Sequence, residues 1–220
     1  MFVPAFAAVT LAIWLVVPGR TSNADAVNEF SWETLRALRR GINSRTIPII
    51  VGVQITSSFL IQGFSSFYPA YLIETKALSA GMAATLFGGF FAVGAVIQAT
   101  SGSVMDRVGV QPTLVGCLVS CVTALWLLPF VGGLVPIIIV TALFAAWNGT
   151  IVVTQTHIAD SLPAEIQGTG FGALKASWML LGATAPIVVG VLADIGRFDE
   201  AFLLLAAVGS IGLYLAIFRL

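Results

Sequence analysis

Six apolar segments, each long enough to cross a lipid bilayer, follow one another between residues 46 and 218. They cover roughly 46–73, 79–104, 112–131, 134–158, 168–194 and 200–218. A membrane-spanning helix needs about 20 mostly apolar residues, and only helices and closed barrels satisfy their own backbone hydrogen bonds in lipid. The sequence therefore predicts six consecutive transmembrane helices joined by short connections.

Charged residues are too few for a chain that is dissolved in water. They make up 9% of the 220 residues, against about 25% in soluble domains, and the mean hydropathy is +1.01. The formal net charge is zero, and the basic residues form no patch of the kind that binds nucleic acid. We therefore expect an all-α integral membrane protein whose surroundings are the lipid bilayer.

A further apolar segment, Phe2–Pro18, precedes the only long polar stretch. Its first basic residue, Arg20, comes after the apolar run, whereas a secretory signal begins with basic residues. The domain prediction is an extra transmembrane helix over 1–18, a cytoplasmic linker over 19–45 and a six-helix bundle over 46–220.

The linker shows the pattern of a short amphipathic helix. Its apolar residues recur at helical spacing at Trp32, Leu35, Leu38 and Ile42, and Ser31 is placed to cap the first turn. Such a helix can lie on the membrane surface with its arginines near anionic lipid heads. A solvated linker helix fits the same pattern, and the sequence leaves both open.

Basic residues gather on one side of the predicted membrane. If every segment spans, one side holds Arg20, Arg36, Arg39, Arg40, Arg45, Arg107 and Arg219. The other side holds Lys76 and Arg197. Because cytoplasmic loops carry the excess of Lys and Arg, we expect the linker and C-terminus in the cytoplasm, the N-terminus outside, and a multi-pass protein of the plasma membrane.

The connection between the second and third segments of the bundle, Gly102–Gly109, reads GSVMDRVG. Its two glycines, Gly102 and Gly109, permit close backbone approach and a tight turn. Asp106 precedes the next helix, whose N-terminus favours a carboxylate, and Arg107 can pair with an acid or a lipid phosphate. This turn resembles the G-x-x-x-D-R-x-G signature of the major facilitator superfamily.

The resemblance extends over nearly the whole chain. By this resemblance, residues 1–18 look like the sixth helix of a twelve-helix transporter. Residues 46–220 look like the C-terminal half of that transporter, built from two inverted three-helix repeats. It implies a secondary transporter that moves a small organic solute by alternating access, with the 102–109 turn as a gating latch. The family signature continues with basic residues after the second glycine, where this chain has Val110-Gln111-Pro112.

A second stretch, Gly190–Gly196, repeats the Gly-x-x-x-Asp spacing between the last two segments. In an inverted repeat, this connection would be the equivalent of 102–109 at the opposite side of the membrane. The earlier stretch Gly168–Gly172 contains closely spaced glycines. No strand is predicted before it, so helix packing explains those glycines better than a dinucleotide loop.

Polar side chains inside the spans are the candidates for contact with cargo, because in hydrocarbon they need partners or a water-filled cavity. In the first span of the bundle they form a stripe of Gln54, Ser58, Gln62 and Ser65. In the fourth span, Trp147, Thr150 and Thr154 share a face. Hydrogen bonding between helices is the alternative role for both sets.

Lys175 is the only formal charge well inside a predicted span, about two helical turns from its start. It is expected either to face a central cavity, where it would attract an anionic cargo, or to snorkel to the cytoplasmic interface. Trp178, one turn deeper, is expected to share the cavity wall with it.

The sequence offers no catalytic residues, cofactor site or metal site. It contains no GxSxG or HExxH motif, and Cys117 and Cys121 alone are too few for structural zinc. Four residues apart on one helix face, the two cysteines are expected to be small packing residues. An enzyme is therefore the least favoured class.

The resemblance places the cargo between two six-helix halves, and this chain supplies one. We therefore expect a separately encoded N-terminal six-helix half, or a second copy of the chain, as partner. The alternative is a truncated gene product that acts as a membrane scaffold without transport. The substrate, the direction of transport and the coupling ion stay open.

Overall fold

The computed structural model describes residues 46–162 and 167–220. These two stretches contain helices and no strand. The predicted extra span over 1–18 and the linker over 19–45 lie outside the described residues. The helices are α3 (Thr46–Glu74), α4 (Ala80–Val108), α5 (Val110–Leu127), α6 (Leu134–Phe144), α7 (Trp147–Ser161), α8 (Gln167–Gly182), α9 (Ala185–Asp194) and α10 (Phe198–Phe218).

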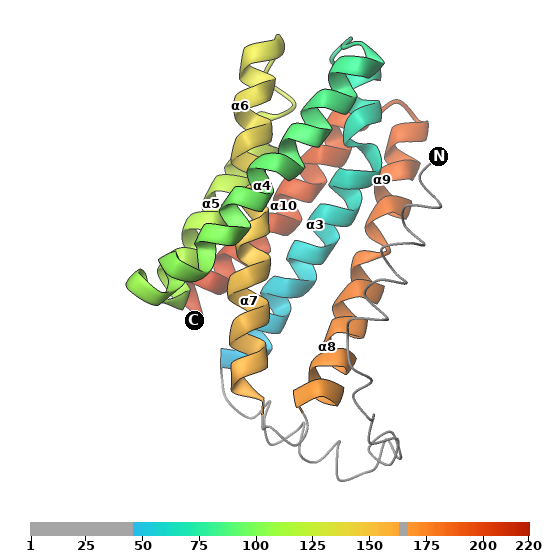
Figure 1. Cartoon of the computed structure of the whole chain (residues 1–220). Helices are drawn as coiled ribbons and strands as arrows, with labels where there is room; N and C mark the ends of the chain where they lie inside the picture. The colour runs from blue at the N-terminus through green and yellow to red at the C-terminus, as the bar shows by residue number, and fades with distance from the viewer. Residues whose placement is uncertain (1–45, 163–166) are drawn as a thin grey trace, which may run out of the picture. The chain divides into compact units, whose positions relative to one another are not determined.

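The prediction of six spans is confirmed. Six segments of the described residues are long and apolar enough to cross a membrane, and α6 with α7 and α8 with α9 each make one of them. The helices lie side by side in alternating direction (Figure 1). We call the end that holds Gly109 and Arg219 the inner end, and the end that holds Lys76 and Arg197 the outer end.

The contacts between helices follow the pattern of two inverted repeats. The first repeat is α3, α4 and α5, and the second is α6/α7, α8/α9 and α10. In this arrangement α3 corresponds to α6/α7, α4 to α8/α9, and α5 to α10. The contact of α4 with α7 therefore has its counterpart in the contact of α8 with α3. The contact of α5 with α7 has its counterpart in the contact of α10 with α3, and all of these contacts occur. The two repeats therefore interlock, with α3 packed against α4, α7, α8, α9 and α10.

The two spans of the second repeat that the sequence shows as continuous are interrupted. Between α6 and α7, Asn148 and Gly149 donate their N–H groups only three residues back, to Ala145 O at 3.1 Å and Ala146 O at 3.0 Å. The Asn148 side chain also donates to Ala145 O at 3.1 Å. These bonds tighten the chain into a 3₁₀ turn, a feature that often marks a hinge.

The second interruption, between α8 and α9, has a proline as its cause. Pro186 lies in the first turn of α9, has no N–H, and crowds the carbonyl four residues before it, that of Gly182. The chain instead closes a turn, with Thr184 N donating to Leu181 O at 3.2 Å. Both spans are thus broken near their middle.

The predicted turn over 102–109 is wrong in its extent. Helix α4 continues through Val108, and the change of direction is confined to Gly109, whose φ is 97° and whose N–H donates to Met105 O at 2.9 Å. Asp106 and Arg107 are exposed in the last turn of α4, where the helix dipole favours the arginine and disfavours the aspartate. A side chain at Gly102 would meet open space, so no close approach involves this glycine within the described residues.

Close packing at α7 depends on Gly149. A methyl group there would lie 2.6 Å from Cys117 Sγ and 2.7 Å from Ser101 Oγ, on α5 and α4. Such small residues let helices approach in a membrane, where association relies on packing rather than on the hydrophobic effect. Cys121 is buried and both cysteines are free thiols, in keeping with a packing role.

Aromatic rings fill the outer half of the bundle core. Phe64 of α3 is their centre, with ring centroids 4.2 Å from Tyr68, 5.2 Å from Phe90 and 4.0 Å from Phe144. The hydroxyl of Tyr68 is hydrogen-bonded to Thr141. Near the outer end, the core is therefore tightly packed and, apart from this hydroxyl pair, apolar.

A polar cluster closes the outer end. Tyr71, which is fully buried, donates its hydroxyl to Asp199 Oδ1 of α10 at 2.6 Å. Lys76 lies 5.4 Å from the Tyr71 ring centroid and donates to Pro129 O at 2.7 Å. Burial lowers the pKa of Lys76 below its usual range, and Asp199 opposes that shift. The cluster ties α3, the α5–α6 connection and α10 together.

We expect Tyr71→Phe to lower the free energy of unfolding by about 1 kcal/mol, because Asp199 would lose a neutral donor that no other group replaces. Thermal unfolding in detergent measures this change. The control is Tyr214→Phe, since Tyr214 is exposed and its hydroxyl makes no hydrogen bond within the described residues. Equal midpoints for the two variants would contradict the role of the cluster.

Candidate functional site

The polar residues of α3 meet the fourth span along a buried seam. Thr154 Oγ1 donates to Gln54 Oε1 at 2.5 Å, and the indole N–H of Trp147 donates to Ser57 O at 2.9 Å. Because α3 and α7 run in opposite directions, these two bonds fix the pairing of the helices. Thr150 lies between Trp147 and Thr154 on the same face of α7.

Helix α3 meets the fifth span, α8/α9, on the side away from α7. Gln62 Nε2 donates to Met179 O of α8 at 3.2 Å and approaches Ser58 Oγ at 3.4 Å. A methyl group at Gly182 would lie 2.5 Å from both Gln62 Nε2 and Ser58 Oγ. The side chains of Gln62 and Ser58 therefore pack directly against the last turn before the α8–α9 interruption.

We call this set of residues the polar seam: Gln54, Ser57, Ser58 and Gln62 of α3, and Trp147, Thr150 and Thr154 of α7. Both interrupted spans take part in this seam. The fourth span supplies Trp147, directly after the α6–α7 interruption, and the fifth span contacts the seam at Gly182. Ser65, the last residue of the predicted stripe, is half-buried. Pro69 deprives its carbonyl of the usual helical donor.

Two hydroxyls in the seam have no partner. Ser57 Oγ and Thr150 Oγ1 are buried and make no hydrogen bond in the described part of the chain. Leaving a buried hydroxyl unpaired costs roughly 1–3 kcal/mol. Because native proteins seldom leave such groups unpaired, these two are the seam's available positions for a water molecule or for a polar group of a ligand.

The predicted cavity residues are thus only partly brought together. Gln54, Ser58, Gln62, Trp147, Thr150 and Thr154 all belong to the seam. Lys175 is exposed on α8, whereas Trp178 is 2% exposed and packs with Ile50, Ile158 and Leu162 inside the bundle. The two side chains therefore do not line one wall within the described bundle.

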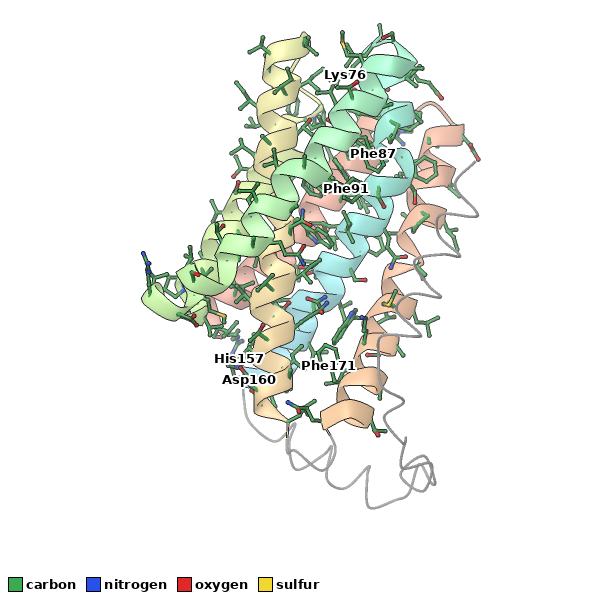
Figure 2. The ribbon with its side chains drawn as sticks, in the orientation of Figure 1. Lys76, Phe87, Phe91, His157, Asp160 and Phe171 are labelled. Carbon is green, nitrogen blue, oxygen red and sulfur yellow. The ribbon has the colours of Figure 1, made fainter. Side chains whose placement is uncertain are left out.

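The inner end of α7 and α8 carries a different set of groups. His157 and Asp160 of α7 and Phe171 of α8 lie near this end, far along the bundle from Lys76 (Figure 2). His157 is half-buried and Asp160 is exposed. The Phe171 ring packs edge-on against Trp178 with centroids 5.8 Å apart, which fixes Trp178 in the core.

Acidic side chains stay out of the middle of the described helices. They lie in the first or last turns, or just after them, at Glu74, Asp106, Asp160, Asp194, Asp199 and Glu200. No group of three or more potential metal ligands occurs among the described residues. The seam is therefore built from amides, hydroxyls and an indole, which bind by hydrogen bonding and stacking.

Sequence reasoning missed Ser57 and Pro186. Ser57 is one residue off the predicted stripe, and its exclusion followed from assigning α3 a single polar face. Pro186 was visible as a proline within an apolar span, and that signal alone could have indicated the interruption.

Comparison with known proteins agrees with this architecture. A search of curated proteins finds no match. A family model described as Major Facilitator Superfamily matches residues 50–220, which include the whole polar seam and both interrupted spans. The match covers more than half of the chain, and the chain belongs to the major facilitator superfamily.

Proposed function

We propose that the chain forms one half of a secondary transporter that moves a small organic solute across the membrane by alternating access. The observation that carries this proposal is the meeting of both interrupted spans with the polar seam of α3. In secondary transporters, interrupted helices near the bilayer middle commonly form the cargo site. Family membership supports transport rather than catalysis.

The cargo is proposed to bind through hydrogen bonds and aromatic contact. Ser57 Oγ and Thr150 Oγ1 are unpaired, and Gln62 can exchange its bond to Met179 O for one to a solute. Ser65 and Lys175 remain proposed contributors to the cavity, whereas Trp178 supports it from the core, where it packs with Ile50, Ile158 and Leu162. Lys175 favours an anionic or neutral solute, since a cation would be repelled.

A partner for this half is supported by the uneven burial of the spans. In the most apolar stretch of each span, 22% of residues are buried in α4 and 22% in α8/α9, against 50% in α3 and 61% in α6/α7. The seam-bearing helices are thus flanked by two spans whose faces are largely uncovered. An N-terminal six-helix half, or a second copy of the chain, would cover those faces and enclose the seam.

The exposure of Lys175 fits the same arrangement. A lysine facing hydrocarbon about two turns inside a span is costly, while one facing a water-filled cavity is not. Its position on α8, one of the two least buried spans, supports a location at the interface between halves. Snorkelling to the inner end is the competing explanation.

The second candidate is a membrane scaffold that transports nothing. It is favoured by the fact that the described residues form one six-helix unit, whereas the family resemblance places cargo between two. Reconstitution of the chain with and without a complementary half, followed by uptake screening of anionic and neutral solutes, separates the two. Uptake in neither form would favour the scaffold.

We expect Lys175→Gln to reduce uptake of an anionic solute about tenfold or more, because a lost contact to a charged group is worth roughly 1.5 kcal/mol or more. Uptake by proteoliposomes measures the change. Lys175→Arg, which keeps the charge, should retain uptake, and protease protection should show unchanged insertion. Undiminished uptake by Lys175→Gln would exclude the cavity role and favour snorkelling.

We expect Pro186→Ala to slow turnover while leaving the half-saturating solute concentration nearly unchanged. An alanine N–H can donate to Gly182 O and make α8 and α9 one continuous helix. The span would then lose the bending point that the proposed alternating-access movement uses. Hydrogen exchange at residues 183–188 should slow in parallel. Pro112→Ala is the control, because Pro112 lies in the first turn of α5, where no helical bond is missing.

The proposed location is the plasma membrane, with the inner end of the bundle in the cytoplasm. In a variant without Cys117 and Cys121, we expect a thiol at Thr75→Cys to react with an impermeant maleimide on intact cells. One at Ser103→Cys should react only after the cells are opened, because Thr75 is exposed directly after α3 at the outer end, and Ser103 is exposed in α4 near the inner end. The reverse labelling pattern would invert the proposed orientation.

A further inference from the structure

A groove opens on the outside of the bundle at its inner end, away from the polar seam. It lies between the first turn of α3 and the last turn of α10, and its volume is about 500 Å³. Its lining residues are Pro48, Ile49, Leu215, Phe218 and Arg219. Four of these are apolar and one is a cation, so the described part of the chain gives the groove a hydrocarbon-like wall with one positive group.

The positive group is available for a ligand. The last carbonyls of α10 are already partnered, because Gln111 Nε2 of α5 donates to Ala216 O at 3.2 Å and to Ile217 O at 3.3 Å. Arg219 is therefore not needed to cap the helix. Its side chain is exposed, and within the described residues the one ion pair is that of Arg197 with Glu200. None of the described residues that line the groove is acidic.

Aromatic side chains place this groove at the depth of lipid headgroups. Tyr214 and Phe218 of α10 are 52% and 68% exposed, and their ring centroids are 5.0 Å apart. Exposed aromatic rings at the end of a span are typical of the membrane–water interface. An arginine one residue further along then lies at the level of the lipid phosphates.

We propose that this groove binds one anionic phospholipid, with its phosphate on Arg219 and an acyl chain along Pro48, Ile49, Leu215 and Phe218. The guanidinium matches a phosphate with two parallel N–H groups, and the apolar wall matches the chain. In the proposed orientation the lipid belongs to the cytoplasmic leaflet, where anionic lipids occur. The site is separate from the cargo seam, and it does not depend on transport.

The test uses the full chain in nanodiscs made from equal amounts of phosphatidylglycerol and phosphatidylcholine. The chain is extracted gently, and the lipids that stay bound are counted by native mass spectrometry. We expect phosphatidylglycerol to be retained about fivefold more often than phosphatidylcholine, the factor that corresponds to roughly 1 kcal/mol per basic side chain. The preference should fall at high salt, because it is electrostatic.

Variants separate the groove from general surface charge. Arg219→Gln should abolish the preference, and Arg219→Lys should keep most of it. Ile49→Trp, which fills the groove, should reduce retention of both lipids. The matched control is Arg197→Gln, because Arg197 is exposed at the outer end and already paired with Glu200; it should retain the wild-type preference.

The proposal is overturned if the wild type retains both lipids equally, if its preference is insensitive to salt, or if Arg219→Gln keeps the preference. It is also overturned if Arg197→Gln loses as much preference as Arg219→Gln. If Arg219→Gln does not fold, the wild type at two salt concentrations and Ile49→Trp decide the question. Each readout is lipid retention, so failure here leaves the transport proposal untouched.

Discussion

The interior of a bilayer offers no water, so every polar group placed there must find its partner within the protein. Most of this structure follows from how α3 meets that requirement. Its side-chain amides would be costly on a lipid-facing helix, and they bond instead across the bundle: Gln54 accepts from Thr154 of α7 on one side, and Gln62 donates to Met179 O of α8 on the other. Burying them makes α3 the helix that the other spans surround, and it brings both interrupted spans to one place.

The number of spans was predictable because it depends on length and apolarity alone. The interruptions inside two of those spans were harder to predict. The one before Pro186 has a cause visible in the sequence, but the 3₁₀ turn before Trp147 involves the Asn148 side chain folding back on Ala145 O. Alanine-rich sequence at that point favours a regular helix. The Gly102–Gly109 stretch was misjudged for a related reason, because its middle residues can continue a helix and only Gly109 needs a positive φ.

The candidate site was predicted in part, since helical spacing correctly groups residues that share a face. Spacing cannot show that α3 is contacted on several sides, and for this reason it does not place Ser57 on the predicted stripe. It also grouped Lys175 with Trp178, although three residues correspond to a rotation that falls about 60° short of a whole turn. That rotation is enough to put one side chain into the core and the other outside it. Which side of a helix is covered depends on its neighbours, and a single sequence does not contain that information directly.

The connection at Gly109 has a mechanical consequence. With only one residue between α4 and α5, there is no slack with which either helix could slide or tilt independently. A displacement of α4 is therefore expected to displace α5 as well. Because α5 contacts α10, the displacement reaches the far side of the bundle. We therefore expect α4 and α5 to move as one unit, and any bending within the described bundle to occur at the two interrupted spans.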